Sequence, residues 1–482
     1  MKLASTALGL CFSFLLLTSL SLAKQGPPPR PATGPTPEIS AQLLQELGAI
    51  RDTALQDDYA YQQLAHLTEN IGPRPSGSVQ AQVAAEYVAS ALRELGLDVR
   101  LEEAKVPHWV RGAEAGELVE YPQQAEHSRQ KVVVTALGGS TATPPDGLTA
   151  PVVVVKNFAE FNSLGRAQVE GKIVLFNFPF DQKKAEAGHA LDAYAESVVY
   201  RGVGARTAAD MGAVASLVRS AGGADYRLPH TGWSAPAGIP AGAVPAEDAE
   251  LIAHLAAEGP VRMHLTLTPQ NMPETTGYNV VADLKGSEQP EKVVVVSGHL
   301  DSWDLGTGAL DDGAGVVIAM ETAQILQQLH LHPKRTIRVV AWMDEENGGA
   351  GSRAYTAAHG KEFVNHVAGI ESDLGAAHPL GFDVKMNHVD IELLRPVQDV
   401  LASFGANLLS PVEFSPGADL AGMAKAGVPT LGVMQDGRTY FNYHHTAADT
   451  LDKVDPRSLR GNAAAMAVMA YVLANMTHSL PR

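Results

Sequence analysis

Histidines and carboxylates gather in short blocks in the second half of the sequence, and residues of these types could hold a metal ion. His299 and Asp301 follow a run of four valines, residues 293–296, and Asp311 and Asp312 come twelve and thirteen positions after His299. Three further blocks are Asp344-Glu345-Glu346, Glu371-Ser372-Asp373 and Tyr443-His444-His445-Thr446-Ala447-Ala448-Asp449-Thr450. Imidazoles and carboxylates without a thiolate suit zinc or a similar divalent ion.

Each block by itself also has an ordinary structural explanation. A single histidine after a valine run is more often a core residue whose hydrogen bonds are satisfied. Glu345 with Glu346, taken alone, would be interpreted as an acidic turn exposed to solvent. For His299 this alternative weakens, because Asp301, Asp311 and Asp312 follow it within thirteen residues. Burying so many carboxylates without a cation would cost much free energy.

The blocks also contain enough ligands for two ions. A two-ion site needs a carboxylate between ions that lie about 3.5–4 Å apart. Asp311, in a glycine-flanked turn, is well placed for that role. Glu345 and Glu346 are adjacent, so one can hold metal while the other faces the substrate cavity.

The elements that must position these blocks are strands of an α/β fold. The four valines indicate a buried central strand of a mainly parallel sheet, since β-branched side chains pack well where both faces are covered. Further strands are predicted at 336–342 and 366–370, and helices at 316–329 and from about 456 onward. Because open α/β sheets bind ligands at the carboxyl ends of their strands, we expect the polar blocks to converge there.

The first forty residues indicate export. Residues 1–23 are predicted to be a secretory signal peptide, and residues 24–40 are a proline-rich leader or linker. Cys11 is the only cysteine and lies in the signal, so the mature chain has no thiol chemistry. We therefore expect a secreted or periplasmic protein that has no membrane segment once the signal is removed.

Length and charge limit the organisation and the partners. With 482 residues, the chain favours two domains or one domain with an insertion. We predict a catalytic domain in two parts, 41–110 and 272–482, around an inserted domain at 111–271. The net charge of −17 argues against nucleic acid and anionic membranes as partners.

The predicted insertion reads as short strands between glycine and proline turns, with one helix near 246–257. Its scattered histidines, His189, His230 and His254, favour hydrogen-bonded or solvated roles over a metal role. His230 lies in a Leu-Pro-His-Thr-Gly loop and could touch substrate at a domain interface. We expect this segment to have a packing and gating role.

The five ordered blocks resemble those of the co-catalytic zinc exopeptidases related to bacterial leucyl aminopeptidase and glutamate carboxypeptidase. The matching stretches are Gly298-His299-Leu300-Asp301-Ser302-Trp303-Asp304, Asp311-Asp312-Gly313, Asp344-Glu345-Glu346, Glu371-Ser372-Asp373 and His445-Thr446-Ala447-Ala448-Asp449-Thr450. Residues 297–304 and 229–232 are more narrowly similar to the carboxypeptidase Q type of this family. The resemblance covers about residues 43–482. It implies a zinc-exopeptidase α/β domain, with a mixed, mainly parallel sheet flanked by helices, and an inserted β-rich protease-associated domain.

The resemblance also implies roles for individual residues. The implied ligands are His299 and Asp373 for one zinc, Glu346 and His445 for the other, and Asp311 as the bridge between them. Glu345 would be the general base, and Asp301 would orient His299, since a metal-bound imidazole usually donates its other nitrogen to a carboxylate. The family pattern selects His445 over His444, because the ligand stands four residues before Asp449.

Four residues are candidates for substrate binding: Asp419, His230, Tyr443 and His444. Asp419 lies in a Pro-Gly-Ala-Asp stretch similar to the Gly-x-Asp of relatives, with a helix N-cap as an equal alternative. On the family's precedent we expect a homodimeric metallo-exopeptidase with two Zn²⁺ per chain that cleaves small unblocked peptides, dipeptides above all. An aminopeptidase on longer peptides would share every metal residue. A non-catalytic binding homologue would have lost ligands or the base, and all six are present.

Overall fold

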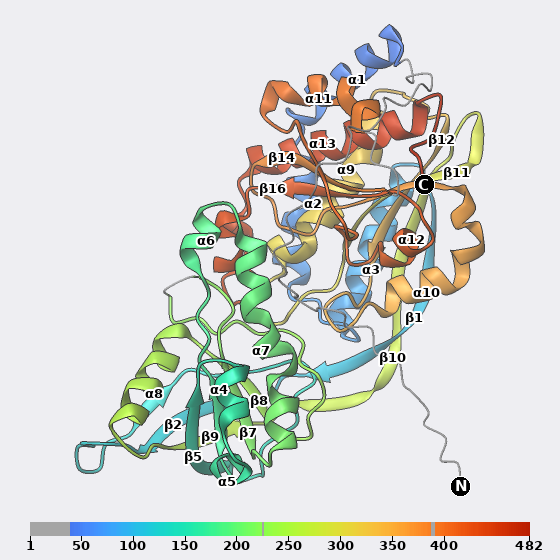
Figure 1. Ribbon diagram of the computed structural model, residues 1–482. Helices are drawn as coiled ribbons and strands as arrows, with labels where there is room; N and C mark the ends of the chain where they lie inside the picture. The colour runs from blue at the N-terminus through green and yellow to red at the C-terminus, as the bar shows by residue number, and fades with distance from the viewer. Residues whose placement is uncertain (1–38, 224–225, 387–390) are drawn as a thin grey trace, which may run out of the picture. The chain divides into compact units, whose positions relative to one another are not determined.

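The computed structural model describes residues 39–223, 226–386 and 391–482 (Figure 1). The predicted signal peptide, 1–23, and all of the proline-rich leader except its last two residues lie outside the described residues. Among the helices of the described segments, none is both long and apolar enough to cross a membrane.

An eight-stranded mixed sheet forms the framework of the predicted catalytic parts. Its order is β1 (Asp98–Val110), β10 (Gln270–Leu284), β12 (Arg335–Trp342), β11 (Gln289–His299), β13 (His366–Glu371), β16 (Thr430–Gln435), β14 (Pro379–Lys385) and β15 (Leu408–Pro411). The four central strands, β12, β11, β13 and β16, run parallel, while β1, β10 and β14 pair antiparallel to a neighbour. The predicted α/β class with a mixed, mainly parallel central sheet is confirmed.

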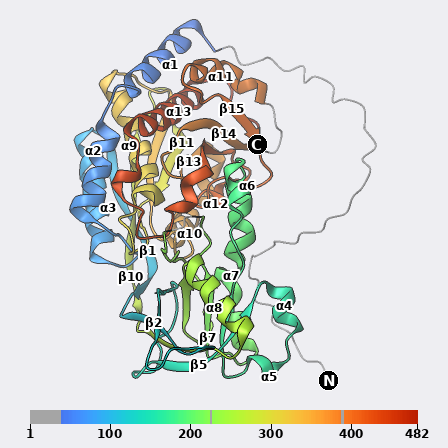
Figure 2. The same cartoon turned by 90° about the vertical axis from the view of Figure 1, so that its left-hand side faces the viewer.

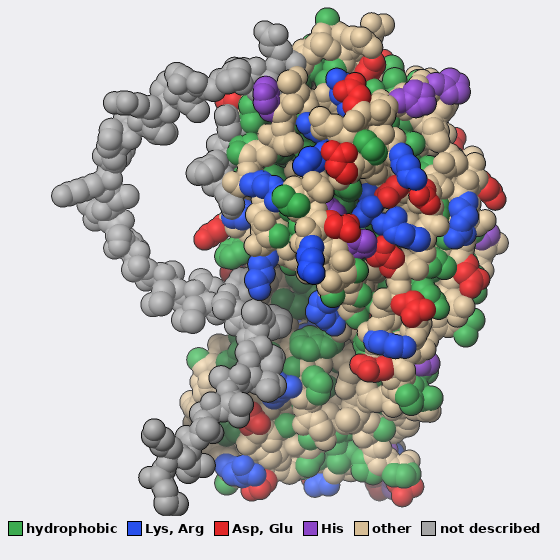
Figure 3. All heavy atoms as spheres, turned by 90° about the vertical axis from the view of Figure 1, so that its right-hand side faces the viewer, with side chains coloured by type: hydrophobic (Ala, Val, Ile, Leu, Met, Phe, Trp, Pro, Cys, Tyr) green, Lys and Arg blue, Asp and Glu red, His purple; other side chains and the backbone are tan. Residues whose placement is uncertain are grey.

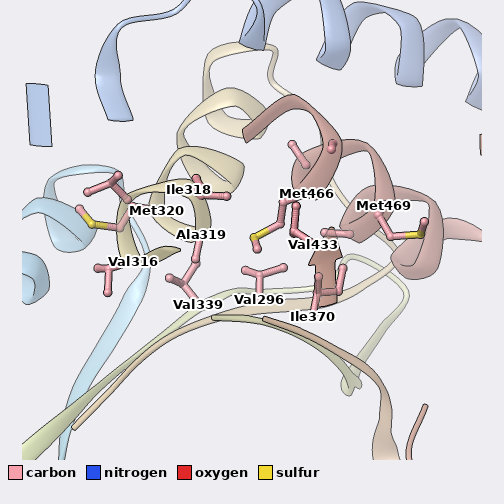
Figure 4. Packing of buried hydrophobic residues seen from close by; sticks show 14 of the residues in the cluster. Val296, Val316, Ile318, Ala319, Met320, Val339, Ile370, Val433, Met466 and Met469 are labelled. Carbon is pink, nitrogen blue, oxygen red and sulfur yellow. The ribbon is translucent and has the colours of Figure 1, made fainter. Parts of the chain in front are cut away.

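Two apolar helices cover one face of this sheet. In Figure 4, side chains of α9 (Ala314–Gln328) and α13 (Pro456–Asn475) point at Val296, Val339 and Ile370 on the central strands. From Ala463 to Ala474 every residue of α13 is buried, as expected for a helix that is apolar on all sides. Packing against α9 and α13 therefore holds these strands in place on one face of the sheet.

Shorter helices surround this core. They are α1 (Ala41–Ala54), α2 (Tyr59–Ala65), α3 (Val79–Glu94), α10 (Ala350–His359), α11 (Arg395–Leu401) and α12 (Ala421–Lys425). Helix α1 packs on α13 (Figure 2). Helix α2 continues directly into a π-helical turn, His66–Ile71. Strand β1 pairs along its length with β10 (Figure 1).

All strands of a second eight-stranded sheet come from the segment between β1 and β10. In sheet order they are β3 (Gln130–Val132), β2 (Glu114–Glu120), β9 (Arg262–Leu267), β5 (Leu148–Val155), β6 (Ile173–Phe176), β7 (Ala215–Arg219), β8 (Ala241–Val244) and β4 (Thr135–Ala136). The short strands expected here are therefore present.

The same segment contains more helix than the sequence indicated. Besides α8 (Ala246–Glu258), which was expected, it holds α4 (Phe158–Ser163), α5 (Arg166–Val169), α6 (Gln182–Glu186) and the long α7 (Ala190–Asp210). Helix α7 is rich in alanine, glycine and polar residues, so its apolar stripe is weak and was missed. It proves important, because one of its side chains reaches the site described below.

Charges of both signs share the surface. On the face shown in Figure 3, Lys and Arg side chains lie among Asp and Glu side chains. The net negative charge of the protein is thus not gathered into a single acidic patch on this face.

Candidate metal centre

Three neighbouring parallel strands bring the polar blocks to one edge of the sheet. Strand β11 ends at His299, β13 ends at Glu371 just before Asp373, and β12 ends at Trp342 just before the block 344–346. Since β12 and β13 both pair in parallel with β11, their carboxyl ends meet. His445 arrives from the loop before α13 and has a left-handed backbone, with φ of 58°.

These residues form two groups, each with one possible ligand atom per residue within 4.8 Å of the others: His299, Asp311 and Asp373, and Asp311, Glu346 and His445. In the first, His299 Nε2 lies 3.0 Å from Asp311 Oδ1 and 3.3 Å from Asp373 Oδ1. In the second, His445 Nε2 lies 3.0 Å from both Asp311 Oδ2 and Glu346 Oε2. The structure thus brings the five candidate ligands together, with a different Asp311 oxygen facing each group.

The donor set fits a pair of divalent cations. Asp311 Oδ2 and Glu346 Oε1 are buried and have no hydrogen-bond partner among the described residues, although histidine nitrogens approach Asp311 closely. Carboxylate oxygens left in this condition are costly unless a cation neutralises them. Nitrogen and oxygen donors without sulfur match the preference of zinc.

Asp301 orients His299 by a different atom from the one expected. The Nδ1 of His299 is 2.9 Å from the backbone carbonyl oxygen of Asp301, whereas the nearest carboxylate oxygen is 3.8 Å away. The Asp301 carboxylate accepts instead from the backbone N–H groups of Glu345 and Glu346, at 3.1 and 3.3 Å. Asp301 therefore fixes the imidazole through its carbonyl and the acidic pair through its carboxylate.

His445 is held by residues from the segment between β1 and β10. Its Nδ1 lies 3.2 Å from the carbonyl oxygen of Thr231, and the N–H of Thr231 donates to the carbonyl of His445 at 2.9 Å. The Arg201 guanidinium on α7 is also 3.1 Å from this Nδ1. Sequence reasoning missed both residues; the only signal was the proximity of Thr231 to His230.

Glu345 belongs to neither ligand group. It is half-buried, and its carboxyl lies close enough to the groups to feel their charges. Burial raises the pKa of Glu345 well above its usual range, and Asp373 and Glu346 raise it further while His299 opposes them. A carboxyl that lies beside the two ligand groups and does not itself bind metal can exchange protons with a molecule bound between them.

Asp419 is the candidate substrate-binding residue with the most unusual surroundings. It is buried, and both of its carboxylate oxygens lack a hydrogen-bond partner among the described residues. Burial raises the pKa of Asp419 to about 7. The N-cap of α12 is Leu420, so the alternative that Asp419 caps this helix is wrong.

The other three candidates differ in their distance from the ligands. His444 Nε2 lies 3.2 Å from Asp311 Oδ2, and His444 Nδ1 lies 3.0 Å from His230 Nε2, so both histidines adjoin the second group. Tyr443 packs against the main hydrophobic core, and the Lys453 ammonium lies over its ring at 5.7 Å. None of the contacts found for Tyr443 in the described segments joins it to a ligand.

Two buried residues anchor the loops that carry the ligands. Asp449 accepts from the N–H groups of Leu310 and Asp311, at 2.6 and 3.2 Å. Arg74, fully buried, donates to the carbonyl oxygens of Leu300, Gly72, Thr307 and Gly308. Asp449 belongs to one of the blocks named from the sequence, whereas no sequence pattern indicated a role for Arg74.

Known proteins are similar to this chain in sequence and in fold. The model of peptidase family M28 matches residues 279–470. Carboxypeptidase Q of Xenopus laevis is 38% identical over 430 residues, covering 88% of this chain and 87% of its own. A peptidase M28 precursor from Shewanella amazonensis superimposes with a TM-score of 0.86 at 34% identity, covering 92% of this chain and 98% of its own. A zinc aminopeptidase from Bacillus subtilis shares the fold, with a TM-score of 0.61 at 21% identity, covering 85% of this chain and 94% of its own. The resemblance expected from the motif blocks is confirmed.

Proposed function

The chain belongs to peptidase family M28, and from this premise we propose that it is a two-zinc exopeptidase acting on small peptides with free ends, dipeptides above all. The observation that carries the proposal is the position of Asp311, which offers one carboxylate oxygen to each ligand group. Such a shared carboxylate is what a co-catalytic ion pair requires. His299 and Asp373 would hold one ion, and Glu346 and His445 the other.

The surrounding residues would divide the chemical work. A bound zinc pair supplies a water of lowered pKa and polarises the scissile carbonyl. Glu345 would accept the proton of that water and return it to the leaving amine, because it stands beside both groups without belonging to either. Asp301 would hold His299 and the Glu345–Glu346 turn in register through the hydrogen bonds described above.

The segment between β1 and β10 would close one side of the cleft. We assign residues 41–110 and 272–482 to the catalytic domain and residues 111–271 to an inserted, protease-associated domain. Contacts of His230 with His444 and of Thr231 with His445 support this closure. A cleft closed in this way admits little more than a dipeptide, whereas an aminopeptidase for longer peptides would need it open.

Export and assembly belong to the same proposal. Secretion rests on the predicted signal peptide at residues 1–23, and a homodimer rests on the family's precedent. A non-catalytic binding role is disfavoured, because all five ligands and Glu345 are present.

A substrate panel tests the proposal. Purified protein should hydrolyse free dipeptides, slow sharply as peptides lengthen, and fail on N-acetylated dipeptides, because an amide would replace the expected charged amine. Chelation should abolish hydrolysis, and added zinc should restore it. Equal rates on dipeptides and decapeptides would favour the longer-peptide aminopeptidase.

A further inference from the structure

Arg201 on α7 is a buried cation at the edge of the metal centre. Arg201 is 9% exposed. Its Nη1 lies 2.9 Å from the Tyr194 hydroxyl, 3.2 Å from the Thr231 carbonyl oxygen and 3.1 Å from His445 Nδ1. The guanidinium is thus anchored by one nitrogen beside a candidate ligand.

Four other arginines with little exposure each use their Nε in a hydrogen bond: Arg74, Arg111, Arg335 and Arg338. Arg111 is paired with Glu114 and Asp304, Arg338 is paired with Asp283, and Arg74 is surrounded by carbonyl oxygens. Among the described residues, neither Arg335 nor Arg201 forms an ion pair, but Arg201 differs in that its Nε is buried without a partner. An uncompensated buried charge is costly, so this position calls for an anion that the chain itself does not provide.

One edge of the Arg201 guanidinium, formed by Nε and Nη2, has no hydrogen-bond partner among the described residues. All hydrogen bonds found for Arg201 in those residues use Nη1, and the unpartnered Nε is buried. Two parallel N–H groups on one edge bind a carboxylate in a bidentate fork. Gly232, at φ of 138°, makes room for this group, because a Cβ there would lie 2.3 Å from the Arg201 Cζ.

We propose that Arg201 binds the free α-carboxylate of the substrate and thereby selects peptides that end one residue beyond the scissile bond. This inference rests on the proposed peptidase function and specifies its substrate class. Asp419 is the natural counterpart for the α-ammonium, because its carboxylate is unpartnered and its N–H donates to Glu371, two residues before Asp373 of the first group, while Arg201 lies beside His445 in the second group. With Arg201 binding the carboxylate end and Asp419 binding the ammonium end, on either side of Asp311, the site would accept molecules of dipeptide length.

A purely structural Arg201 would behave differently. If it served only to hold Thr231 and His445, replacing it would reduce metal content and slow all substrates alike. If it binds the carboxylate, the loss depends on whether the substrate carries that carboxylate. Comparing one dipeptide with its C-terminal amide separates these cases.

The experiment measures kcat/KM for a dipeptide acid and its amide, together with zinc content. Wild type should prefer the acid by about 10- to 100-fold, the usual range for a hydrogen-bonded charged contact. Arg201→Gln should lose this preference and treat acid and amide similarly, with zinc content retained. Arg201→Lys should keep part of the preference, since it keeps the charge but not the fork.

Two further variants complete the design. Arg206→Gln is the matched control, because Arg206 is exposed on the same helix and donates to the Pro236 carbonyl; it should keep the wild-type preference. Gly232→Ala should weaken the preference by displacing the guanidinium while its charge remains. Glu345→Gln should bind the acid more tightly than the amide without turning either over, and the double variant Glu345→Gln with Arg201→Gln should bind the two similarly.

The outcomes distinguish this inference from the function on which it rests. Wild type that hydrolyses acid and amide equally, or Arg201→Gln that keeps the preference or loses zinc, would overturn the carboxylate role and leave the peptidase function standing. A wild type that hydrolyses neither substrate with zinc bound would overturn the proposed function, and this inference with it.

Discussion

Asp311 determines the geometry of the site more than any other residue. Its two carboxylate oxygens face two different histidines, and its own N–H is fixed by Asp449. This hydrogen bond fixes the backbone of Asp311 in a place where its carboxylate lies between the two histidines. The shared position of Asp311 therefore follows from the loop that Asp449 and Arg74 anchor.

The adjacent glutamates should separate proton transfer from metal binding. Glu345→Gln should keep both zinc ions and lose turnover by about 10²- to 10⁴-fold, the usual contribution of general acid–base catalysis. Glu346→Gln should weaken zinc binding, because Glu346 Oε2 is close to His445. Metal analysis and steady-state kinetics on the two variants form a matched pair, and normal turnover by Glu345→Gln would reverse the assignment.

Sequence reasoning reached the ligands because each one follows a strand end or belongs to a spaced block. It did not reach Thr231 or Arg201, because their contact with His445 joins segments more than two hundred positions apart. It also gave Asp301 the correct partner through the wrong atom, since residue spacing does not decide between a carbonyl and a carboxylate. Assignments of this kind require the folded backbone.

At the scale of elements, α9 is a core helix that carries one buried ionisable side chain. Glu321 lies on α9, fully buried, and accepts from the N–H of Ala60 on α2 at 3.0 Å. Its other oxygen has no partner in the described part of the chain. Burial, assisted by Asp57, raises the pKa of Glu321 to about 8.

The pKa of Glu321 predicts a pH-dependent stability. Above its ordinary pKa of 4.5 the unfolded chain loses this proton, while the folded chain keeps it up to about 8. The free energy of unfolding of wild type, relative to Glu321→Gln, should therefore fall as pH rises through this window, by at most about 1.4 kcal/mol per pH unit. Urea unfolding of both proteins from pH 5 to 8.5 measures the difference, and a difference that stays constant or grows would contradict the burial argument.

Elements were predictable where their apolar pattern was strong. The valine strand became β11, and the predicted helix at 316–329 became α9, one to two residues off at its ends. Helix α7 was missed because small residues give it little amphipathic signal, although it packs tightly at positions such as Gly204 against Phe176.

For the molecule as a whole, folding gathers buried carboxyl groups at the edge of the catalytic sheet where β11, β12 and β13 end, without a cation from the described part of the chain to neutralise all of them. Burial raises the pKa values of Asp373, Glu371 and Glu346 above their usual ranges. Folding without cations must therefore retain protons on some of these carboxyls or bear their repulsion. Ion binding and global stability should be linked for this reason.

Metal removal should consequently destabilise the protein. Wild type loaded with zinc should unfold at a higher temperature than chelated protein, and free zinc at a hundred times its dissociation constant should add about 2.7 kcal/mol for each independent site. Differential scanning calorimetry across a zinc titration measures this. Arg206→Gln should follow the wild-type curve, whereas Glu346→Gln should respond less, and an unfolding temperature insensitive to zinc would refute the linkage.

Titrating metal-free protein with zinc while recording dipeptide hydrolysis tests whether two ions share Asp311. Activity should continue to rise until about two equivalents per chain are bound, and Asp311→Asn should lose both the full activity and the second equivalent. Full activity reached with one bound zinc per chain, and no further change on adding a second, would contradict the account.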